Sequence, residues 1–362
     1  MNKVRIGMIG TSWWANHYYL NNIKTHPEAE LTAVCGRSQT KAQELADHHG
    51  IPNVYTDYHA MLTPGKLDAV IVATPEDLHY PMVMRALEIG LHVICEKPMA
   101  LKADEARQMW EKAEQAGLKH MISFTNRWVP GYRHLKDLLG SGYLGQIYQG
   151  LFQWIVDWNL PRERYLWYFD EQHAHGVASQ MGSHILDLAR WYLGEIVRVQ
   201  ANLSSTIPVL DGEGQFVSGE NDSASLMLDF ANGAQGVMHL SNISRAAPRL
   251  FEAGQLTTLI GEKGAIKAEV DPWTQKENIY ATREDQDSVE ILAVPDGFYG
   301  DVNRDHFWEI FQKQSIGPRA FIDAIIKDET VGPNFFDGYQ VQRVIEAALE
   351  SAKSGKAVNL NS

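Results

Sequence analysis

The chain has 362 residues and a formal net charge of −13 at pH 7, which suits two domains and argues against a nucleic-acid surface with its clustered lysine and arginine. Hydrophobic residues make up 44% and charged residues 21% of the chain, a balance that predicts a globular protein and excludes a disordered one. No secretory signal pattern and no apolar run near the ~20 residues of a membrane helix occur, so we expect a cytoplasmic protein without membrane partners.

Short apolar runs typical of buried strands alternate with amphipathic stretches in the first third of the chain. The predicted strands are Val4–Ile9, Leu31–Cys35, Ala69–Ala73, His92–Cys95 and His120–Phe124. The predicted helices are Thr40–His49, Tyr80–Glu88 and Ala103–Ala116. This alternation predicts an α/β, Rossmann-type, doubly wound parallel sheet in residues 1–123. The two cysteines, Cys35 and Cys95, fall in predicted strands and are expected to be buried free thiols.

The pattern changes after Phe124. Long strands are predicted at Gln146–Trp158, Val197–Ile207, Ser223–Phe230, Ala234–Ile243 and Gln255–Leu259. The pair Asn232-Gly233 predicts a hairpin, because both residues tolerate positive φ. Helices are expected near Ser183–Leu193 and Tyr339–Ser354. We therefore predict that residues 124–362 form a C-terminal α+β domain with a large, mainly antiparallel sheet, used for substrate binding and oligomerisation.

The first predicted strand ends in a loop that partly matches the dinucleotide fingerprint. Its residues are Gly10, Thr11, Ser12, Trp13, Trp14 and Ala15. Gly10 and Ala15 fit the tight-turn and helix-packing positions, whereas Ser12 replaces the glycine that lets the pyrophosphate approach. An ordinary strand-to-helix turn would fit as well, but the first βα turn of a doubly wound sheet is where dinucleotides bind. We therefore predict that the residues from Gly10 to Trp14 bind a nicotinamide cofactor.

The end of the second predicted strand favours NADP over NAD. NAD sites usually carry Asp or Glu here for the ribose hydroxyls, but this chain has Gly36 followed by Arg37 and Ser38. No carboxylate would repel a 2′-phosphate, and Arg37, Ser38 and Lys41 could bind one. The alternative is that Arg37 is a solvent-exposed loop arginine.

Further segments form an ordered set of motifs. They are Ala73-Thr74-Pro75 after Val72, His79, Ala86–Val93, Glu96-Lys97-Pro98 after Cys95, Asn126-Arg127 before Pro130, Gly182-Ser183-His184 with Asp187, and Ile345–Val358. With these motifs at this spacing, the sequence resembles the Gfo/Idh/MocA oxidoreductase family (glucose–fructose oxidoreductase, inositol dehydrogenase and relatives) over nearly its whole length. The resemblance implies an enzyme with an NAD(P) cofactor that acts on CH–OH groups.

Glu96 and Lys97 end a predicted parallel strand, and ligands bind at the carboxyl edge of such sheets. Pro98 biases Lys97 away from helical geometry, so that Lys97 can project into a cleft. The resemblance implies that Lys97 hydrogen-bonds the reacting hydroxyl or carbonyl and that Glu96 lies near the cofactor. It also places other residues in the cofactor site, namely Ala73, Thr74, Pro75, His79, Asn126 and Arg127.

His184 is the second predicted catalytic residue. In the family an Asp four residues earlier orients this histidine, and another Asp follows three residues later. Here the corresponding residues are Gln180 and Asp187, which would share one helical face with His184. Gln180 can hold the imidazole but stabilises imidazolium less than a carboxylate does, so Asp187 could be the orienting partner. Outside this context, a lone histidine on a helix is usually a core residue.

His173, His175 and His184 could suggest a metal site, but a zinc site needs more converging ligands, and we expect no metal.

Aromatic residues cluster just before these histidines, namely Trp154, Trp158, Tyr165, Trp167 and Tyr168. Flat aromatic faces suit sugars, although most such residues pack in cores. We predict that Trp154 and Tyr168 line the substrate site, and Arg162 and Arg164 could meet an anionic group of the substrate or lie in a loop.

Together these residues predict reversible hydride transfer between NADP or NAD and a sugar, polyol or cyclitol. His184 would take the hydroxyl proton while Lys97 stabilises the alkoxide. Two alternatives stay open: an NAD-dependent glycosidase or lyase with transient redox, and a non-catalytic NAD(P)-binding regulator, which Gln180 and Ser12 favour. The resemblance also implies a homo-oligomer, a dimer or tetramer, with the open face of the antiparallel sheet as its interface.

Overall fold

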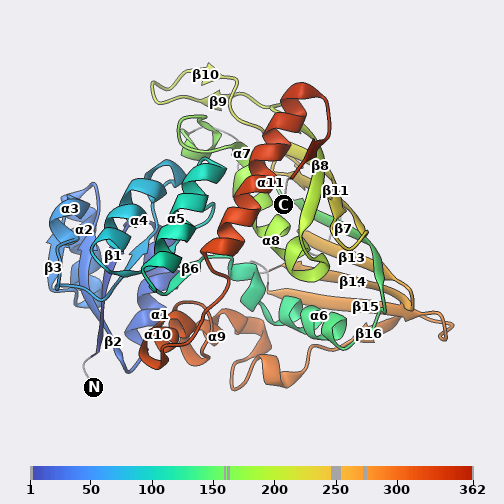
Figure 1. Ribbon diagram of the computed structural model, residues 1–362, viewed down its shortest axis with the longest axis horizontal. Coiled ribbons are helices and arrows are strands. Elements are labelled where there is room, and N and C mark those ends of the chain that lie inside the picture. Colours follow the sequence, from blue (N-terminus) through green and yellow to red (C-terminus); the bar gives the residue numbers. More distant parts are fainter. Residues whose placement is uncertain (1–2, 159, 161–163, 246–253, 272–274, 361–362) are drawn as a thin grey trace. The chain divides into compact units, whose positions relative to one another are not determined.

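The structure, a computed structural model, describes residues 3–158, 160, 164–245, 254–271 and 275–360. The chain divides into two compact units, Met1–Phe124 with Trp308–Gln342, and Thr125–Phe307 with Arg343–Ser362 (Figure 1). The first unit thus includes a return segment, Trp308–Gln342, which the sequence assigns to the second domain. The division at residues 123 and 124 into a cofactor part and a substrate part stays a prediction.

The first unit contains a six-stranded parallel sheet of the Rossmann type, as the sequence predicts. In spatial order its strands are β3 (Asn53–Tyr55), β2 (Ala29–Cys35), β1 (Val4–Ile9), β4 (Ala69–Val72), β5 (His92–Cys95) and β6 (His120–Ile122). Every residue of β4 is buried, which is expected where helices cover both faces of a parallel sheet. The strand order reverses between β1 and β4, and such switch points are where these sheets bind ligands.

Helices join these strands, and their ends follow local sequence signals. They are the π-helix η1 (Ala15–Leu20), α1 (Asn21–Lys24), α2 (Gln39–His49), α3 (Tyr58–Met61), η2 (Glu76–Leu78), α4 (His79–Glu88) and α5 (Ala103–Gln115). Ser38 begins α2, where its side chain accepts a hydrogen bond from the Lys41 backbone N–H at 3.3 Å. Gly50 ends α2 in the left-handed conformation.

The return segment packs on the first unit through aromatic and polar side chains. It contains α9 (Ile310–Lys313), α10 (Pro318–Lys327) and the start of α11 (Phe335–Ser354). The Phe311 ring meets the Tyr18 ring edge-on at 5.1 Å between centroids. His26 Nε2 lies 3.1 Å from Asp323 Oδ1, and the Pro333 carbonyl accepts a hydrogen bond from the Ile122 N–H at 3.0 Å. These contacts join positions more than 200 residues apart, so no local pattern could predict them.

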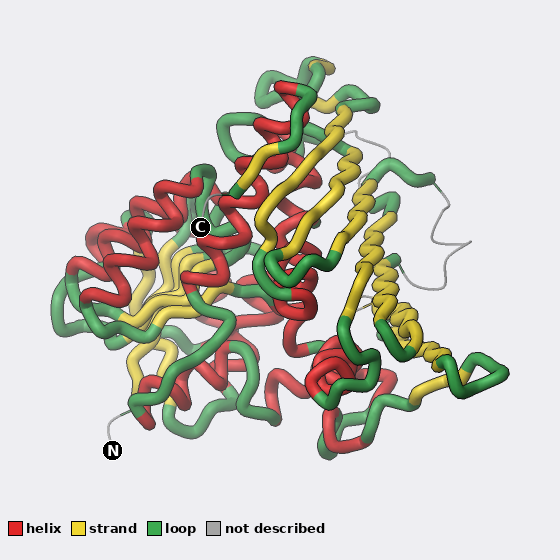
Figure 2. The backbone as a smooth tube through the Cα atoms, turned by 45° about the vertical axis from the view of Figure 1, so that its right-hand side comes forward, coloured by secondary structure: helices red, strands yellow, loops and turns green. Residues whose placement is uncertain are grey.

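The second unit contains a nine-stranded sheet that is antiparallel except between β7 and β12. Its order is β16 (Glu290–Leu292), β15 (Lys276–Arg283), β14 (Gly264–Asp271), β13 (Gln255–Gly261), β7 (Ile147–Ile155), β12 (Gln235–Ser241), β11 (Ser223–Phe230), β8 (Ile196–Ser204) and β17 (Val358–Asn359). Burial alternates along β11, so this sheet has one packed and one open face. Figure 2 shows its long strands as a twisted layer. The predicted large, mainly antiparallel sheet is confirmed.

Among the described residues, the second unit also has short elements and two longer helices, Pro130–Gly140 and Gly182–Leu193, that pack beside the sheet. They are η3 (Thr125–Trp128), α6 (Pro130–Gly140), η4 (Trp167–Phe169), α7 (Gly176–Gln180), α8 (Gly182–Leu193), the hairpin β9 (Val209–Leu210) and β10 (Phe216–Val217), η6 (Asp296–Phe298), and η7 (Arg304–Glu309) at the boundary between the units. The hairpin predicted at Asn232-Gly233 joins β11 and β12, but only Gly233 has positive φ; the Asn232 side chain instead accepts a hydrogen bond from the Ala234 N–H. Among the described helices, none has the length and apolar character that crossing a bilayer requires.

Replacement of Gly10 by alanine should disrupt the first unit. A Cβ there would lie 2.2 Å from the Ala73 carbonyl oxygen, and the φ of Gly10 is +125°. We expect Gly10→Ala to lower the free energy of unfolding by ~3 kcal/mol because strain and a steric clash combine. Gly50→Ala is the matched control: φ is +72° with open space around it, so we expect a loss of only about 1 kcal/mol. Equal losses in urea unfolding would contradict the close approach.

Candidate active site

The switch point of the first sheet brings the ends of β1, β2 and β4 together. Gly10 donates its N–H to the Cys35 carbonyl at 2.9 Å, and Ala73 donates its N–H to the Ile9 carbonyl at 2.8 Å. The Ser12 side chain accepts a hydrogen bond from the Ala15 N–H at 3.1 Å and so caps the following helix. Ser12 and Trp13 are exposed and Gly10, Thr11 and Trp14 are half-buried, so this loop is open to a ligand.

The loop after β2 presents positive charge to solvent. Arg37 and Lys41 are exposed, while Ser38 is half-buried and caps α2. Cys35, at the end of the strand, is a buried free thiol as predicted. The exposed positions leave Arg37 and Lys41 available for a phosphate.

Glu96, just after β5, is held by three hydrogen bonds. Its Oε1 accepts one from Trp14 Nε1 at 2.7 Å and one from the Tyr19 hydroxyl at 2.7 Å. Its Oε2 accepts a third from the Lys97 backbone N–H at 3.1 Å. Glu96 is only 8% exposed, so these donors replace the water that a buried carboxylate loses. Neither Trp14 nor Tyr19 could be linked to Glu96 from the sequence, because more than 70 residues separate them.

Lys97 follows at the carboxyl edge of the sheet and is half-buried. Burial lowers the pKa of the Lys97 ammonium below its usual range, while the carboxylates of Glu96 and Glu76 oppose this shift. A lysine in such surroundings can be a hydrogen-bond donor whose charge is lost at lower pH than that of a surface lysine.

His79, a predicted cofactor residue, is buried between two loops at the carboxyl edge of the first sheet. It is 0% exposed, and its place in the cofactor site stays a prediction. Its Nε2 lies 2.9 Å from the Thr74 carbonyl and its Nδ1 lies 2.9 Å from the Pro98 carbonyl. His79 therefore connects the loop after β4 with the loop after β5, because its two ring nitrogens contact one carbonyl in each loop. Thr74 and Pro75 are half-buried and stay predicted cofactor residues, as does Ala73 with 8% exposure.

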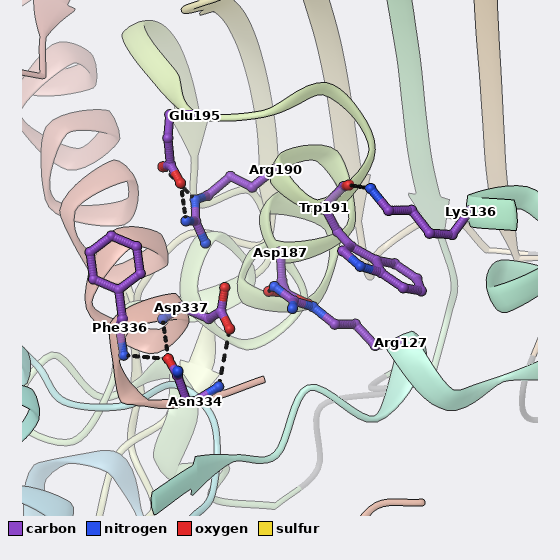
Figure 3. Close-up of polar contacts among 9 residues, drawn as sticks. All are labelled: Arg127, Lys136, Asp187, Arg190, Trp191, Glu195, Asn334, Phe336 and Asp337. Atoms are coloured by element: carbon purple, nitrogen blue, oxygen red, sulfur yellow. Dashed lines mark hydrogen bonds and ion pairs between the residues drawn. The ribbon is translucent and has the colours of Figure 1, made fainter. Parts of the chain in front are cut away.

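In the second unit, Arg127 forms a bidentate ion pair with Asp187 (Figure 3). The Nε–Oδ2 distance is 2.7 Å and the Nη2–Oδ1 distance is 2.5 Å. Asp187 is fully buried, and its predicted role beside His184 stays a prediction. Asn126, 4% exposed, donates to the Gln255 side chain at 3.2 Å.

The helix predicted to carry Gln180, His184 and Asp187 is two helices. Gln180 ends α7, and α8 begins at Gly182, with Met181 between them. Asn221 fixes the start of α7: its carbonyl accepts a hydrogen bond from the Val177 N–H and its side chain one from the Ala178 N–H, both at 2.9 Å. This clamp was missed, because a single asparagine 40 residues downstream carries no recognisable signal.

Gly176 is the second part of this clamp. Its φ is +58°, and a Cβ there would lie 2.2 Å from the Asn221 carbonyl oxygen. Only a residue without a side chain allows this backbone contact, so the structure requires glycine at position 176.

Trp154 of the aromatic cluster lies against His184. The Trp154 ring meets the His184 ring edge-on at 6.0 Å between centroids, and both residues are largely buried. Tyr168 is half-buried and contacts its neighbours Trp167 and Phe169. Arg162 lies outside the described residues. Among the described residues, no group of three or more His, Cys, Asp or Glu side chains is arranged to hold a metal ion.

Comparison with known proteins decides the family. Residues 4–124 match the model described as "Oxidoreductase family, NAD-binding Rossmann fold", and residues 132–267 match "GFO/IDH/MocA C-terminal domain". The chain belongs to the Gfo/Idh/MocA oxidoreductase family. It is an NAD(P)-dependent oxidoreductase by this membership, as its motifs predict.

Several members of the Gfo/Idh/MocA family resemble this chain over almost their full length. D-glucoside 3-dehydrogenase of Escherichia coli is 28% identical, covering 99% of this chain and 98% of its own. D-xylose 1-dehydrogenase (NADP(+)) 2 of Haloferax volcanii is also 28% identical, covering 92% and 93%. The solved structure of levoglucosan dehydrogenase with NADH and levoglucosan superposes with a TM-score of 0.87 at 22% identity and covers 100% of both chains, which confirms the fold.

The buried ion pair between Arg127 and Asp187 gives a prediction about stability. Asp187→Asn leaves the Arg127 guanidinium, whose side chain is 13% exposed, without its charged partner. We expect the free energy of unfolding to fall by ~3 kcal/mol, as for other broken buried pairs. The control, Asp229→Asn, breaks the more exposed Arg198–Asp229 pair and should cost below about 1 kcal/mol in the same urea titration. A loss no larger for Asp187→Asn would mean that the pair is not a buried constraint.

Proposed function

We propose that this protein is a dehydrogenase of sugars, polyols or cyclitols in which Lys97 is the catalytic hydrogen-bond donor. The observation that carries this proposal is the placement of a half-buried Lys97 at the carboxyl end of β5, directly after a Glu96 carboxylate fixed by three hydrogen bonds. The relatives that support the substrate class are dehydrogenases of a glucoside, of xylose and of levoglucosan.

Each residue has a role that its chemistry allows. The Lys97 ammonium binds the reacting oxygen and stabilises negative charge that develops on it. His184 takes the hydroxyl proton as a general base, and Trp154, packed against its ring, limits the positions that the imidazole can adopt. Gln180 and Asp187 are proposed to orient His184, and Tyr168 to line the substrate site. A bound nicotinamide supplies the hydride chemistry.

The residues around the switch point fit an NAD(P) cofactor. The close approach of Gly10 to Ala73 leaves a backbone cradle after β1 without a side chain, and pyrophosphates bind at such turns. We propose that the loop from Gly10 to Trp14 forms the cofactor site together with further residues, namely Ala73, Thr74, Pro75, His79, Glu96, Lys97, Asn126 and Arg127. NADP is proposed over NAD because Arg37, Ser38 and Lys41 stand where NAD enzymes have an acidic residue.

We also propose that the chain forms a homo-oligomer through the open face of the second sheet. Four apolar side chains on neighbouring strands are between 44% and 54% exposed there: Tyr148, Leu151, Met227 and Val237. Exposed apolar residues in a patch favour an interface. A monomeric mass by light scattering would contradict this interface.

A cytoplasmic location stays a prediction from the sequence.

Lys97→Ala tests the catalytic role. Sugars, polyols and cyclitols are first screened with NADP and NAD by nicotinamide absorbance. On the substrate found, Lys97→Ala should lower kcat at least about 100-fold, as for other lost charge-stabilising donors, while cofactor binding stays measurable by fluorescence. Because burial lowers the pKa of Lys97, wild-type kcat should fall with rising pH below the usual lysine range. Unchanged kcat in Lys97→Ala would refute the role, and product without net NAD(P)H change would favour a lyase or glycosidase.

Arg37→Ala tests the cofactor preference. Loss of a hydrogen bond to a charged 2′-phosphate should lower kcat/KM for NADP about tenfold and leave that for NAD within about twofold. Arg107→Ala, which removes an arginine paired with Asp104 and Glu111 on α5, should change neither value. Wild-type kcat/KM that is equal or higher for NAD would show that the preference for NADP is wrong.

A further inference from the structure

The helix after the phosphate loop is a π-helix, η1, from Ala15 to Leu20. In a π-helix the backbone bonds from residue i to residue i+5, and such turns are rare and often lie at functional sites. Trp14, which precedes η1 with helical φ and ψ, and Tyr19 are five residues apart. In an α-helix, side chains at this spacing point roughly 140° apart around the axis. The wider π turn lets both side chains point to the same side.

Both side chains reach the same oxygen atom. Trp14 Nε1 and the Tyr19 hydroxyl each lie 2.7 Å from Glu96 Oε1. Tyr19 is completely buried and Glu96 is 8% exposed. The π turn therefore places two hydrogen-bond donors on one carboxylate oxygen of Glu96, the residue immediately before Lys97.

We propose that Trp14 and Tyr19 are positioning residues that hold the Glu96 carboxylate in one fixed orientation, and through it keep the Lys97 side chain protonated. This inference rests on the proposed function of Lys97 as the hydrogen-bond donor to the substrate oxygen. Trp14 and Tyr19 do not touch the reacting atoms in this role. They act on Glu96, which acts on Lys97.

The electrostatics around Lys97 support the direction of this effect. Burial lowers the pKa of Lys97, and the negative charges of Glu96 and Glu76 raise it. The hydrogen bonds from Trp14 and Tyr19 hold the Glu96 carboxylate in one position, so its charge acts on Lys97 from a fixed place. Without these bonds the carboxylate could turn away, and Lys97 would lose its proton more readily.

The other titratable groups that interact electrostatically with Glu96 are neutral near pH 7. Burial raises the pKa values of Tyr18, Tyr19 and Cys95 well above their usual ranges, and burial lowers the pKa of His79. None of these four groups can therefore replace Glu96 as the charge that keeps Lys97 protonated.

A purely structural role predicts a different outcome, and neighbouring residues separate the two. Tyr18 is buried next to Tyr19 and interacts electrostatically with Glu96, but its hydroxyl has no hydrogen-bond partner among the described residues. Trp308 packs edge-on against Trp14 at 6.2 Å between centroids. Tyr18→Phe and Trp308→Phe thus disturb the same core without removing a donor to Glu96.

The test compares Trp14→Phe and Tyr19→Phe with these two controls. The first measurement is the pH dependence of Lys97 labelling by an amine-reactive reagent, followed by mass spectrometry of the peptide that contains Lys97. The second is the pH profile of kcat with the substrate found in the screen. Urea unfolding of each variant verifies that it is folded at every pH used.

We expect the Lys97 titration and the basic limb of kcat to move to lower pH in Trp14→Phe and Tyr19→Phe, and in neither control. At neutral pH each of the two substitutions should lower kcat about tenfold, the factor expected for one lost hydrogen bond to a charged group. In Tyr19→Phe, KM for the cofactor should change by less than about twofold, because Tyr19 is completely buried and is not among the proposed cofactor residues. Trp14 is one of those residues, so the cofactor KM is used as a readout for Tyr19→Phe alone.

The proposal is overturned if either Trp14→Phe or Tyr19→Phe leaves the Lys97 titration unchanged, or if Tyr18→Phe shifts it equally. Labelling needs no turnover, so this result is independent of the proposed function. If no substrate is oxidised or reduced, the proposed function fails while the labelling experiment still decides the role of Trp14 and Tyr19. Because Tyr19→Phe removes a single oxygen atom, it keeps the test usable even if Trp14→Phe does not fold.

Discussion

The close approach between the turn after β1 and the carbonyl of Ala73 is the constraint on which the first unit depends. A Cβ at Gly10 would lie 2.2 Å from that oxygen, so only glycine allows β1 and β4 to end at the same level. Backbone hydrogen bonds from Gly10 to Cys35 and from Ala73 to Ile9 then align three strand ends. Because the sheet order reverses at this place, the loops that follow diverge and leave their backbone N–H groups available to a phosphate.

Buried polar groups fix the remaining parts of the site. Glu96 accepts three hydrogen bonds, Arg127 and Asp187 form a bidentate ion pair, and the Asn221 side chain and carbonyl cap α7. Removing charges from water is costly, and such groups persist only where every lone pair and proton has a partner. Each arrangement therefore allows one geometry of the loops and helices that carry Lys97 and His184.

The departures from the family pattern have local physical consequences. Ser12 replaces a glycine of the phosphate loop, and its side chain caps the helix by accepting the Ala15 N–H. Glu96 is linked to the same segment through Trp14 and Tyr19, so the helix that starts at the cofactor loop also orients the end of β5. Gln180 is the last residue of α7, and Met181, whose φ and ψ are helical, lies between it and α8, which carries His184.

The pattern of apolar residues along the chain was enough to predict the local elements, and the contiguous motifs were enough to recognise the family. The boundaries of β1, β5 and β11 follow the apolar runs directly, because a buried strand must be continuously or alternately apolar. The motif around Lys97 was recognisable because its residues are contiguous. Only the tertiary structure decided which side chains meet: the return segment packed on Tyr18, the burial of His79 between two loops, Asp187 paired with Arg127, and two donors on Glu96. These partners lie tens to hundreds of residues apart, and no periodicity along the chain encodes contacts that arise only when distant elements pack.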